Sequence, residues 1–385
     1  MGFQSLEQKA SQILNKADIE INGNKPHDIQ IYNPDFYKKI FSKGSLGLGE
    51  SYMDGDWDVS SLDQFFYKTL SSNLEQELKS PNIFLNILTS KLSSLFSNIS
   101  HGHRKSKAFE VGKKHYDLGN ELYEIMLDNN MTYTCGYWKD AKNLDEAQTA
   151  KLDLVCKKIG LKEGDFVLDI GCGFGSFARH ASKNYKAKVK GLTISEEQVK
   201  YTQEINKDLT VAIKIQDYRD ETGKEKFNSI VSLGMFEHVG IKNHRTYMKK
   251  VSELLKDNGI FLLHTIGRKT SSKKCDPWIK EYIFPNSLLP SQQQIAEATE
   301  GILVEEDSHN FGADYDKTLM TWHENFTNSW LKLKAQNPKK YDDRFKRMWD
   351  YYLLSCAGAF RARKLQLWQK VFSKNGVKGG YKSIR

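Results

Sequence analysis

The second half of the sequence alternates short apolar segments with longer polar ones, and this alternation limits the folds available to the chain. The apolar segments have the length of strands, and the segments between them have helical spacing, as in 196–206 and 244–255. Short apolar strands that alternate with helices are typical of a parallel sheet covered on both faces. The predicted strands are 166–170, 187–193, 211–215, 227–233, 260–266, 302–310 and 365–372.

The last two predicted strands are separated by long helical segments, 318–334 and 341–360. Seven strands with a late, hairpin-like edge predict a Rossmann-like α/β domain with a mostly parallel sheet.

The first hundred residues predict a smaller, α-rich domain. A polar stretch after Asn98 separates two regions of apolar patterning, so we expect an N-terminal domain over 1–100, a linker over 101–110 and a catalytic domain over 111–385. Within the first domain we expect a strand near 29–31, a helix over 35–41 and a glycine-punctuated turn over 44–51.

A segment from residue 81 to residue 99 predicts an amphipathic helix. Its apolar residues recur at steps of three and four, and Arg104, Lys105, Lys107, Lys113 and Lys114 follow it. This apolar stripe is interpreted as packing in the small domain or in a dimer interface. The basic cluster keeps membrane insertion open, because each cation near an anionic leaflet contributes about 1 kcal/mol.

Composition limits the class of protein further. The chain of 385 residues has a formal charge of +9 and a pI near 9.0, which favours polyanions such as anionic lipid or nucleic acid, or reflects lysines on solvated helix faces. Its five cysteines have no metal-ligand spacing, which indicates free thiols in a reducing compartment and predicts no metal site. We expect neither a signal peptide nor a membrane-spanning helix, and hence a cytoplasmic protein.

The segment VLDIGCGFG, 167–175, predicts a ligand site. It is a buried strand that leads into a turn with Gly171, Gly173 and Gly175, where the lack of Cβ atoms lets a ligand approach the backbone. Its GxGxG spacing, preceded by Asp169, resembles the first motif of class I methyltransferases that use S-adenosylmethionine (SAM). A structural turn or another nucleotide-binding fold remains the alternative.

Residues at the ends of the neighbouring strands extend this predicted SAM site. Gln198 is the candidate for the ribose contact, since the second strand ends in GLTIS without an acidic residue. Gln216 and Asp217 lie where adenine would be recognised, and the alternative for Asp217 is an ordinary helix or turn cap. The other predicted cofactor residues are Tyr133, Thr134, Cys172, Thr193, Ile194 and Ser195.

Several longer motifs carry a specific resemblance. HYDLGNELYEIMLD (115–128), MTYTCGYW (131–138), GMFEHVG (234–240), LLHTIG (262–267), DPWIKEYIFPN (276–286), HNFGADYDKTL (309–319) and CAGAFRARKLQLWQ (356–369) closely resemble the bacterial cyclopropane-fatty-acyl-phospholipid synthases. The resemblance extends over nearly the whole chain.

The resemblance implies methyl transfer from SAM to a cis double bond of a phospholipid acyl chain, followed by ring closure with a bound bicarbonate as base. It places the bicarbonate pocket at Cys135, Glu237, His264, the backbone of Ile266, and Tyr315. It also implies a homodimer that acts on unsaturated phospholipids at the inner membrane surface and does not bind nucleic acid. Aromatic side chains in the same motifs could stabilise the cationic intermediate: Tyr133, Tyr137, Trp138, Phe236 and Tyr315.

Each pocket residue also has a purely structural interpretation. His264 could be a core histidine, Cys135 a small buried residue and Glu237 a carboxylate at a helix start. Cys356 is interpreted as a structural thiol in a helix and is only a weak catalytic candidate, because a thiolate has no step to perform in alkene methylation. Two other functions stay open: a related SAM-dependent lipid methyltransferase with a methylene or methyl-branched product, and a non-catalytic lipid-surface or nucleic-acid-binding protein.

Overall fold

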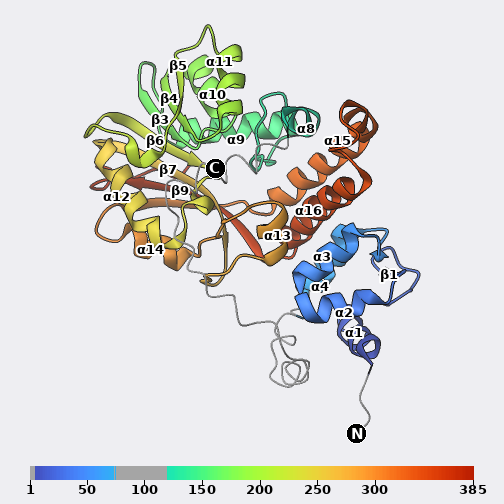
Figure 1. Cartoon of the computed structure of the whole chain (residues 1–385). Helices are drawn as coiled ribbons and strands as arrows, with labels where there is room; N and C mark the ends of the chain where they lie inside the picture. The colour runs from blue at the N-terminus through green and yellow to red at the C-terminus, as the bar shows by residue number, and fades with distance from the viewer. Residues whose placement is uncertain (1–4, 73, 75–118) are drawn as a thin grey trace. The chain divides into compact units, whose positions relative to one another are not determined.

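The computed structural model describes residues 5–72, 74 and 119–385, which divide into two compact units (Figure 1). The first unit contains the described residues before 103 together with Asp276–Phe284 and Thr327–Lys364. The second contains 119–275, Pro285–Phe326 and Leu365–Arg385. The predicted linker over 101–110 and the predicted helix over 81–99 lie outside the described residues and stay predictions. The sequence did not indicate that two late segments pack with the N-terminal unit.

The second unit is built on a seven-stranded sheet in the order β5-β4-β3-β6-β7-β9-β8. Its strands are β3 (Phe166–Ile170), β4 (Lys188–Thr193), β5 (Val211–Ile215), β6 (Phe227–Leu233), β7 (Leu255–Arg268), β8 (Val304–Asn310) and β9 (Leu365–Ser373). The strands from β3 to β7 are parallel to their neighbours, and β9 runs antiparallel to β7 and β8. The predicted Rossmann-like sheet with a late antiparallel edge is therefore confirmed.

Helices cover both faces of this sheet. Successive strand residues point to opposite sides, and since both sets are apolar, each face packs against helices. Leu168, Ile230 and Phe261 belong to a buried cluster with residues of α12 (His244–Leu254) and α14 (Gln292–Thr299). The adjacent residues Val167, Val231 and Leu262 belong to a second cluster with α9 (Leu144–Lys158) and α10 (Ser176–Tyr185). Among the described residues, the other α-helices of this unit are α8 (Asn120–Met126), α11 (Glu196–Ile205) and the first part of α15 (Asp314–Gln336).

The first unit is α-rich, as predicted, and surrounds the buried indole of Trp57. Its described elements are α1 (Leu6–Asn15), β1 (Gln30–Ile31), α2 (Asp35–Lys43), α3 (Ser45–Met53), β2 (Trp57–Asp58), α4 (Leu62–Ser71), α13 (Pro277–Tyr282), the last part of α15, and α16 (Asp343–Arg361). The Trp57 ring packs at centroid distances of 6.1 Å from Phe36 and 5.3 Å from Phe65. Its Nε1 donates to Leu48 O at 3.0 Å and to Ser51 Oγ at 3.1 Å.

The glycine-punctuated turn predicted over 44–51 is wrong, because most of this segment forms α3. Gly44, with φ of 59°, makes the break between α2 and α3. The next two glycines serve close packing instead. A Cβ at Gly47 would lie 2.2 Å from Lys39 O, and one at Gly49 would lie 2.2 Å from the Trp278 ring. The sequence showed the glycines but not that they allow helices to approach.

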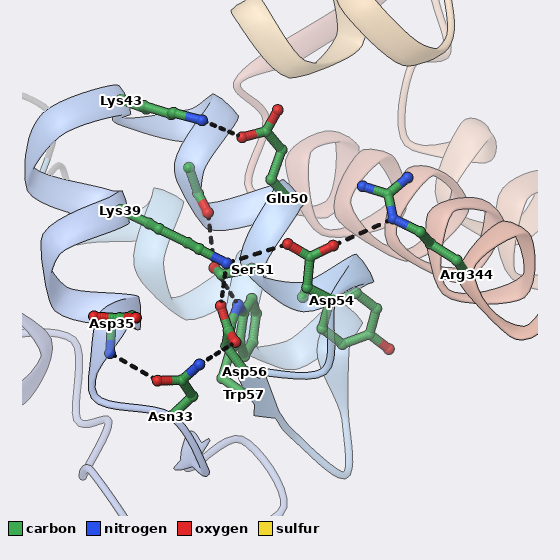
Figure 2. Close-up of polar contacts among 12 residues, drawn as sticks. Asn33, Asp35, Lys39, Lys43, Glu50, Ser51, Asp54, Asp56, Trp57 and Arg344 are labelled. Carbon is green, nitrogen blue, oxygen red and sulfur yellow. Dashed lines mark hydrogen bonds and ion pairs between the residues drawn. The ribbon is translucent and has the colours of Figure 1, made fainter.

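A polar network joins α2 to the loop after α3 (Figure 2). Lys39 Nζ donates to Asp54 Oδ2 at 3.1 Å and to Asp56 Oδ2 at 2.6 Å. Asp56 also accepts from Asn33 Nδ2 at 2.8 Å, and Asp54 accepts from Arg344 Nε of α16 at 3.2 Å. These contacts account for Asp54 and Asp56 as structural groups of the first unit.

Candidate active site

The predicted site residues follow the carboxyl ends of adjacent parallel strands. Gly171 comes directly after β3, Thr193 ends β4, and Glu237 lies in a 3₁₀ turn, Phe236–His238, just after β6. His264 lies near the end of β7. The chain leaves β3 for β4 on one side, while β6 lies on the other, so this edge contains a topological switch point where α/β proteins bind ligands.

The glycine loop after β3 has the open backbone that a ligand site needs. Gly171 has φ of 80°, and a Cβ there would lie 2.6 Å from Met235. Gly173 also has a positive φ, and a Cβ there would meet no atom within 4 Å, while Gly175 caps α10 in the left-handed region. Cys172 is buried against Gly191 of β4. The loop therefore exposes backbone and has no bulky side chain of its own at Gly173.

Asp169 supplies an unsatisfied carboxyl oxygen beside this loop. The residue is 1% exposed, and its Oδ2 has no hydrogen-bond partner among the described residues. Burial raises the pKa of the Asp169 carboxyl to about 7, although the charge of Lys151 opposes the rise. A buried acceptor without a partner is destabilising by itself, and it fits a ligand that brings a polar hydrogen, such as the amino group of SAM.

The end of β4 holds Gln198 in a defined orientation. Thr193 Oγ1 donates to Gln198 Oε1 at 2.6 Å, and Ser195 caps α11 by accepting from Gln198 N at 3.4 Å. Since the carbonyl oxygen of Gln198 already accepts a hydrogen bond, its amide nitrogen is the group suited to donate to a ribose oxygen. The predicted roles of Thr193, Ile194, Ser195 and Gln198 in cofactor binding stay predictions.

Gln216 and Asp217, the predicted adenine contacts, are engaged with neighbouring residues. Gln216 Nε2 donates to Glu221 Oε2 at 2.9 Å. Asp217 caps the 3₁₀ turn Tyr218–Asp220 and pairs with Arg219, whose Nε lies 2.8 Å from Asp217 Oδ1. The structural interpretation as a turn cap therefore describes contacts that Asp217 makes. Recognition of adenine stays a prediction and would use the remaining lone pairs of its carboxylate.

The segment before α9 packs Thr134 and Cys135 against the same edge. Lys151 Nζ of α9 donates to Thr134 Oγ1 at 2.8 Å, and a Cβ at Gly234 would lie 2.9 Å from Thr134 Cγ2. Cys135 is fully buried, and its Sγ lies 3.8 Å from Thr318 Oγ1 of α15. Burial raises the pKa of the Cys135 thiol well above its usual value, so the sulfur is held as a neutral thiol.

Thr318 joins this segment to α15, the helix that carries Tyr315 one turn earlier. Its Oγ1 accepts from Gly136 N at 3.1 Å and from Trp138 Nε1 at 2.9 Å. Sequence reasoning missed Thr318, because a threonine inside a helix gives no signal of what it contacts across 180 residues.

An aromatic cluster extends from the glycine loop to α15. Tyr123 packs 5.6 Å from Phe174 of the loop and 5.2 Å from Tyr133. Trp322 of α15 lies 5.3 Å from Tyr133 and 6.1 Å from Tyr315. Two of the predicted cation-stabilising residues, Tyr133 and Tyr315, are thus in one cluster. The predictions for Tyr137, Trp138 and Phe236 stay untested, but Phe236 stacks 4.1 Å from His244 in the core.

Glu237 and His264 each present an unsatisfied polar atom. Ile266 N donates to Glu237 Oε1 at 2.7 Å, so without a ligand the Ile266 amide is engaged by the carboxylate. Within the part of the chain that the structure describes, Glu237 Oε2 and His264 Nε2 have no hydrogen-bond partner, although both residues are at most 4% exposed. Glu237 is hydrogen-bonded to Ile266, two residues from His264 on β7, so these two unsatisfied atoms indicate a place for a small polar ligand.

Burial sets the charge of these two groups in opposite directions. It raises the pKa of the Glu237 carboxyl to about 7 and lowers that of the His264 imidazole well below its usual value. His264 is therefore neutral at neutral pH, while Glu237 can be present in either form.

Lys151 is a functional candidate that sequence reasoning missed. It is fully buried, and burial lowers the pKa of its ammonium to about 8. Its charge contributes to the low pKa of His264 and opposes the raised pKa values of Asp169 and Cys135. One signal could have revealed it: Gln148, Lys151 and Lys158 interrupt the apolar face of α9 at helical spacing and are all buried.

Cys356 lies on α16, in the first unit, and not in the unit that contains Glu237 and His264. The predicted helix is confirmed. The thiol is half-buried, beside half-buried Leu354 and Ser355 rather than on the fully buried face of the helix, and its structural role stays a prediction.

Comparisons with known proteins point to one family. The family described as mycolic acid cyclopropane synthetase matches residues 103–370. The cyclopropane-fatty-acyl-phospholipid synthase of Escherichia coli (strain K12) is 53% identical over 376 residues, which cover 98% of this chain and 95% of that protein.

Solved structures agree with this result. The cyclopropane synthase MmaA2 from Mycobacterium tuberculosis has a TM-score of 0.63 and 28% identity, covering 69% of this chain and 98% of that chain. The mycolic acid cyclopropane synthase CmaA1, complexed with SAH and CTAB, has a TM-score of 0.63 and 29% identity with the same coverage.

Proposed function

Because this chain belongs to the mycolic acid cyclopropane synthetase family, we propose that it converts cis double bonds of phospholipid acyl chains into cyclopropane rings, with SAM as the methyl donor. It is a SAM-dependent methyltransferase of the class I fold. Support for the phospholipid substrate comes from the similarity to the Escherichia coli synthase, which extends over 98% of the chain.

The reaction requires an electrophile and a base. Bound SAM supplies an electrophilic methyl group on a sulfonium. The π electrons of the alkene form a new bond to the methyl carbon, and the electrons of the broken C–S bond stay on sulfur. The acyl chain then carries a positive charge, and loss of one proton from the new methyl group lets the ring close. A protein carboxylate in contact with the methyl donor could itself be methylated, which favours an exchangeable base.

The observation that carries the proposal is the pair of buried, unsatisfied atoms on Glu237 and His264. They fit a bicarbonate ion, whose hydroxyl could donate to Glu237 Oε2 and whose oxygen could accept from His264 Nε2. Bicarbonate would supply the base that takes the proton. Cys135, Tyr315 and the amide of Ile266 would complete its surroundings. The Ile266 amide, which now donates to Glu237 Oε1, would have to donate to the ion instead.

The buried surroundings also protect the cation from water. Tyr133, Tyr315 and Trp322 belong to one aromatic cluster, and the face of an aromatic ring attracts a desolvated cation by about 2 kcal/mol or more. The neutral state of His264 means that the imidazole itself adds no positive charge to the site.

A phospholipid substrate requires the enzyme to act at a membrane surface. Among the described residues, no helix is both long enough and apolar enough to span a bilayer. We infer peripheral binding to the cytoplasmic face through the net charge of +9, and we keep the homodimer as a proposal.

The test is product analysis with unsaturated phospholipid vesicles, SAM and bicarbonate. We expect the acyl chain to gain one CH₂ by mass spectrometry and to show upfield ring-methylene protons by NMR. Vinylic methylene protons at the same mass would instead identify a related lipid methyltransferase. No mass gain, together with no binding of SAM in a calorimetric titration, would leave a non-catalytic lipid-surface protein.

A further inference from the structure

A buried polar chain leads away from His264 on the side opposite to its unsatisfied atom. In the sheet register, His264 of β7 is paired with Gln369 of β9, and Gln369 is paired with His309 of β8. Lys158, the last residue of α9, reaches this row from the helix layer. His264, Gln369 and Lys158 are each at most 1% exposed, so their hydrogen bonds form without competition from bulk water.

Lys158 fixes the orientation of the Gln369 amide. Lys158 Nζ lies 2.9 Å from Gln369 Oε1 and 3.0 Å from His309 Nδ1. A lysine ammonium has three donors and no acceptor. If the amide were reversed, its NH₂ group would face the ammonium, which places two donors against each other. Burial lowers the pKa of Lys158 to about 7, so the ammonium form below this pH fixes the orientation, because a neutral amine has a lone pair that could accept from a reversed amide.

The oriented amide in turn determines which nitrogen of His264 carries the proton. With its oxygen toward Lys158, Gln369 directs Nε2 at His264 Nδ1 over 3.3 Å. Nδ1 must then accept. A neutral imidazole carries one N–H, so the proton is on Nε2, the buried atom that has no partner among the described residues.

We infer that Gln369, held by Lys158, is a positioning residue that keeps His264 in the tautomer with its proton on Nε2. The importance of this tautomer rests on the proposed function, since an Nε2–H donates to an anion whereas a bare Nε2 would present a lone pair to it. The lysine thus acts on the anion site through two hydrogen bonds without contacting the ligand.

The first test reads the tautomer directly and needs no catalysis. ¹⁵N-histidine labelling and long-range ¹H–¹⁵N correlation distinguish a protonated Nε2 from a protonated Nδ1, and the His264 signals are identified by their loss in His264→Gln. The full-length wild type is expected to show Nε2–H. The variant Gln369→Glu places an acceptor beside Nδ1 and is expected to move the proton to Nδ1. A wild type with Nδ1–H, or a variant that keeps Nε2–H, would overturn the inference.

The second test asks whether the tautomer affects anion use. In CO₂-depleted buffer, Gln369→Glu should raise the bicarbonate concentration for half-maximal activity by roughly 10- to 100-fold, the range for loss of one hydrogen bond to a charged group. The Kd for SAM should be unchanged. Lys158→Met should give a mixture of tautomers and a smaller rise. Lys157→Met is the matched control, because that side chain is 58% exposed and pairs with Asp153, and it should change neither readout.

The two tests separate the inference from the proposed function. A wild type whose activity does not respond to bicarbonate would remove the proposed base, while the NMR result would still decide the tautomer. If Gln369→Glu shifts the tautomer but leaves the bicarbonate response unchanged, Gln369 orders His264 without serving the anion site, and the positioning role is wrong.

Discussion

Replacement of Glu237 by glutamine should make the protein more stable and nearly inactive at the same time. Ile266 N donates to Glu237 Oε1, and the glutamine carbonyl can accept this hydrogen bond in the same place. The other oxygen, Oε2, has no partner among the described residues, so its change to an amide breaks no contact that the structure shows. The substitution therefore removes a buried ionisable group without loss of packing.

The gain in stability follows from the raised pKa. Burial raises the pKa of Glu237 from 4.5 to about 7, which corresponds to about 3 kcal/mol at about 1.4 kcal/mol per pH unit. The protonated carboxyl of Glu237 makes its full contribution to the free energy of unfolding below pH 4.5, and this contribution is lost as the pH rises through about 7. Glutamine cannot ionise, so Glu237→Gln should equal the wild type near pH 4.5 and exceed it by about 3 kcal/mol above pH 7.

Thermal or urea unfolding between about pH 5 and pH 8.5 measures this difference, and Glu204→Gln on the exposed side of α11 is the control. The rate of cyclopropane formation should fall by at least roughly 100-fold, since a positioned base contributes about 10²–10⁴-fold, while the Kd for SAM stays the same. A variant less stable than the wild type at about pH 8 would refute the reasoning. Equal loss of SAM affinity would show that Glu237 is structural.

Three further predictions concern the glycine loop, α15 and the surface. Gly171→Ala should lower the free energy of unfolding by about 1–3 kcal/mol and weaken SAM binding measured by calorimetry, because the residue has a φ of 80° and the new Cβ would crowd Met235. The control is Gly164→Ala, where φ is 82° but the space around the new Cβ is open. Weaker SAM binding in both variants would contradict the crowding argument. Thr318→Val leaves Gly136 N and the Trp138 indole without their acceptor and should lower the free energy of unfolding by about 1–3 kcal/mol. Thr321→Val is the control. A loss under about 0.5 kcal/mol for Thr318→Val, equal to that of the control, would argue against this role of Thr318. Binding to anionic vesicles, measured by sedimentation, should weaken as salt rises, and salt-independent binding would exclude an electrostatic origin.

The central strands β3 and β6 could be predicted because they are short, largely apolar and separated by helical segments. Consecutive residues such as Val167 and Leu168 contact different helix layers, which requires apolar side chains at both positions and makes the strand visible in the sequence. The segment 44–51 was wrongly predicted as a turn because glycine spacing looks the same for a turn and for close helix packing. Only the neighbouring Lys39 backbone and Trp278 ring distinguish the two.

Sequence analysis found the site residues that stand out in motifs, and it missed residues whose role depends on what they pack against in the fold. Glu237 and His264 lie in recognisable motifs, and the structure shows both with unsatisfied buried atoms. Lys151 looks like an ordinary polar residue of a helix, and Gln369, although it ends the motif 356–369, looks like an ordinary polar residue of a strand. Their importance comes from burial and from partners distant in sequence: Gln369 contacts Lys158 over 211 positions and His264 over 105. No local pattern encodes such pairs.

The first unit is built from segments that are translated early and late, and this affects when it can fold on the ribosome. Arg347 of α16 lies 3.9 Å from the Tyr52 ring centroid and donates to Asp58 Oδ2 at 2.9 Å. Gly358 brings α16 so close to α4 that a Cβ would lie 2.7 Å from Asp63 O. The N-terminal helices thus lack these partners until nearly the whole chain has been translated, although domains usually fold as they emerge. The packing of α4 and the Tyr52 ring against α16 can therefore form only after residue 361 has been made, late in elongation.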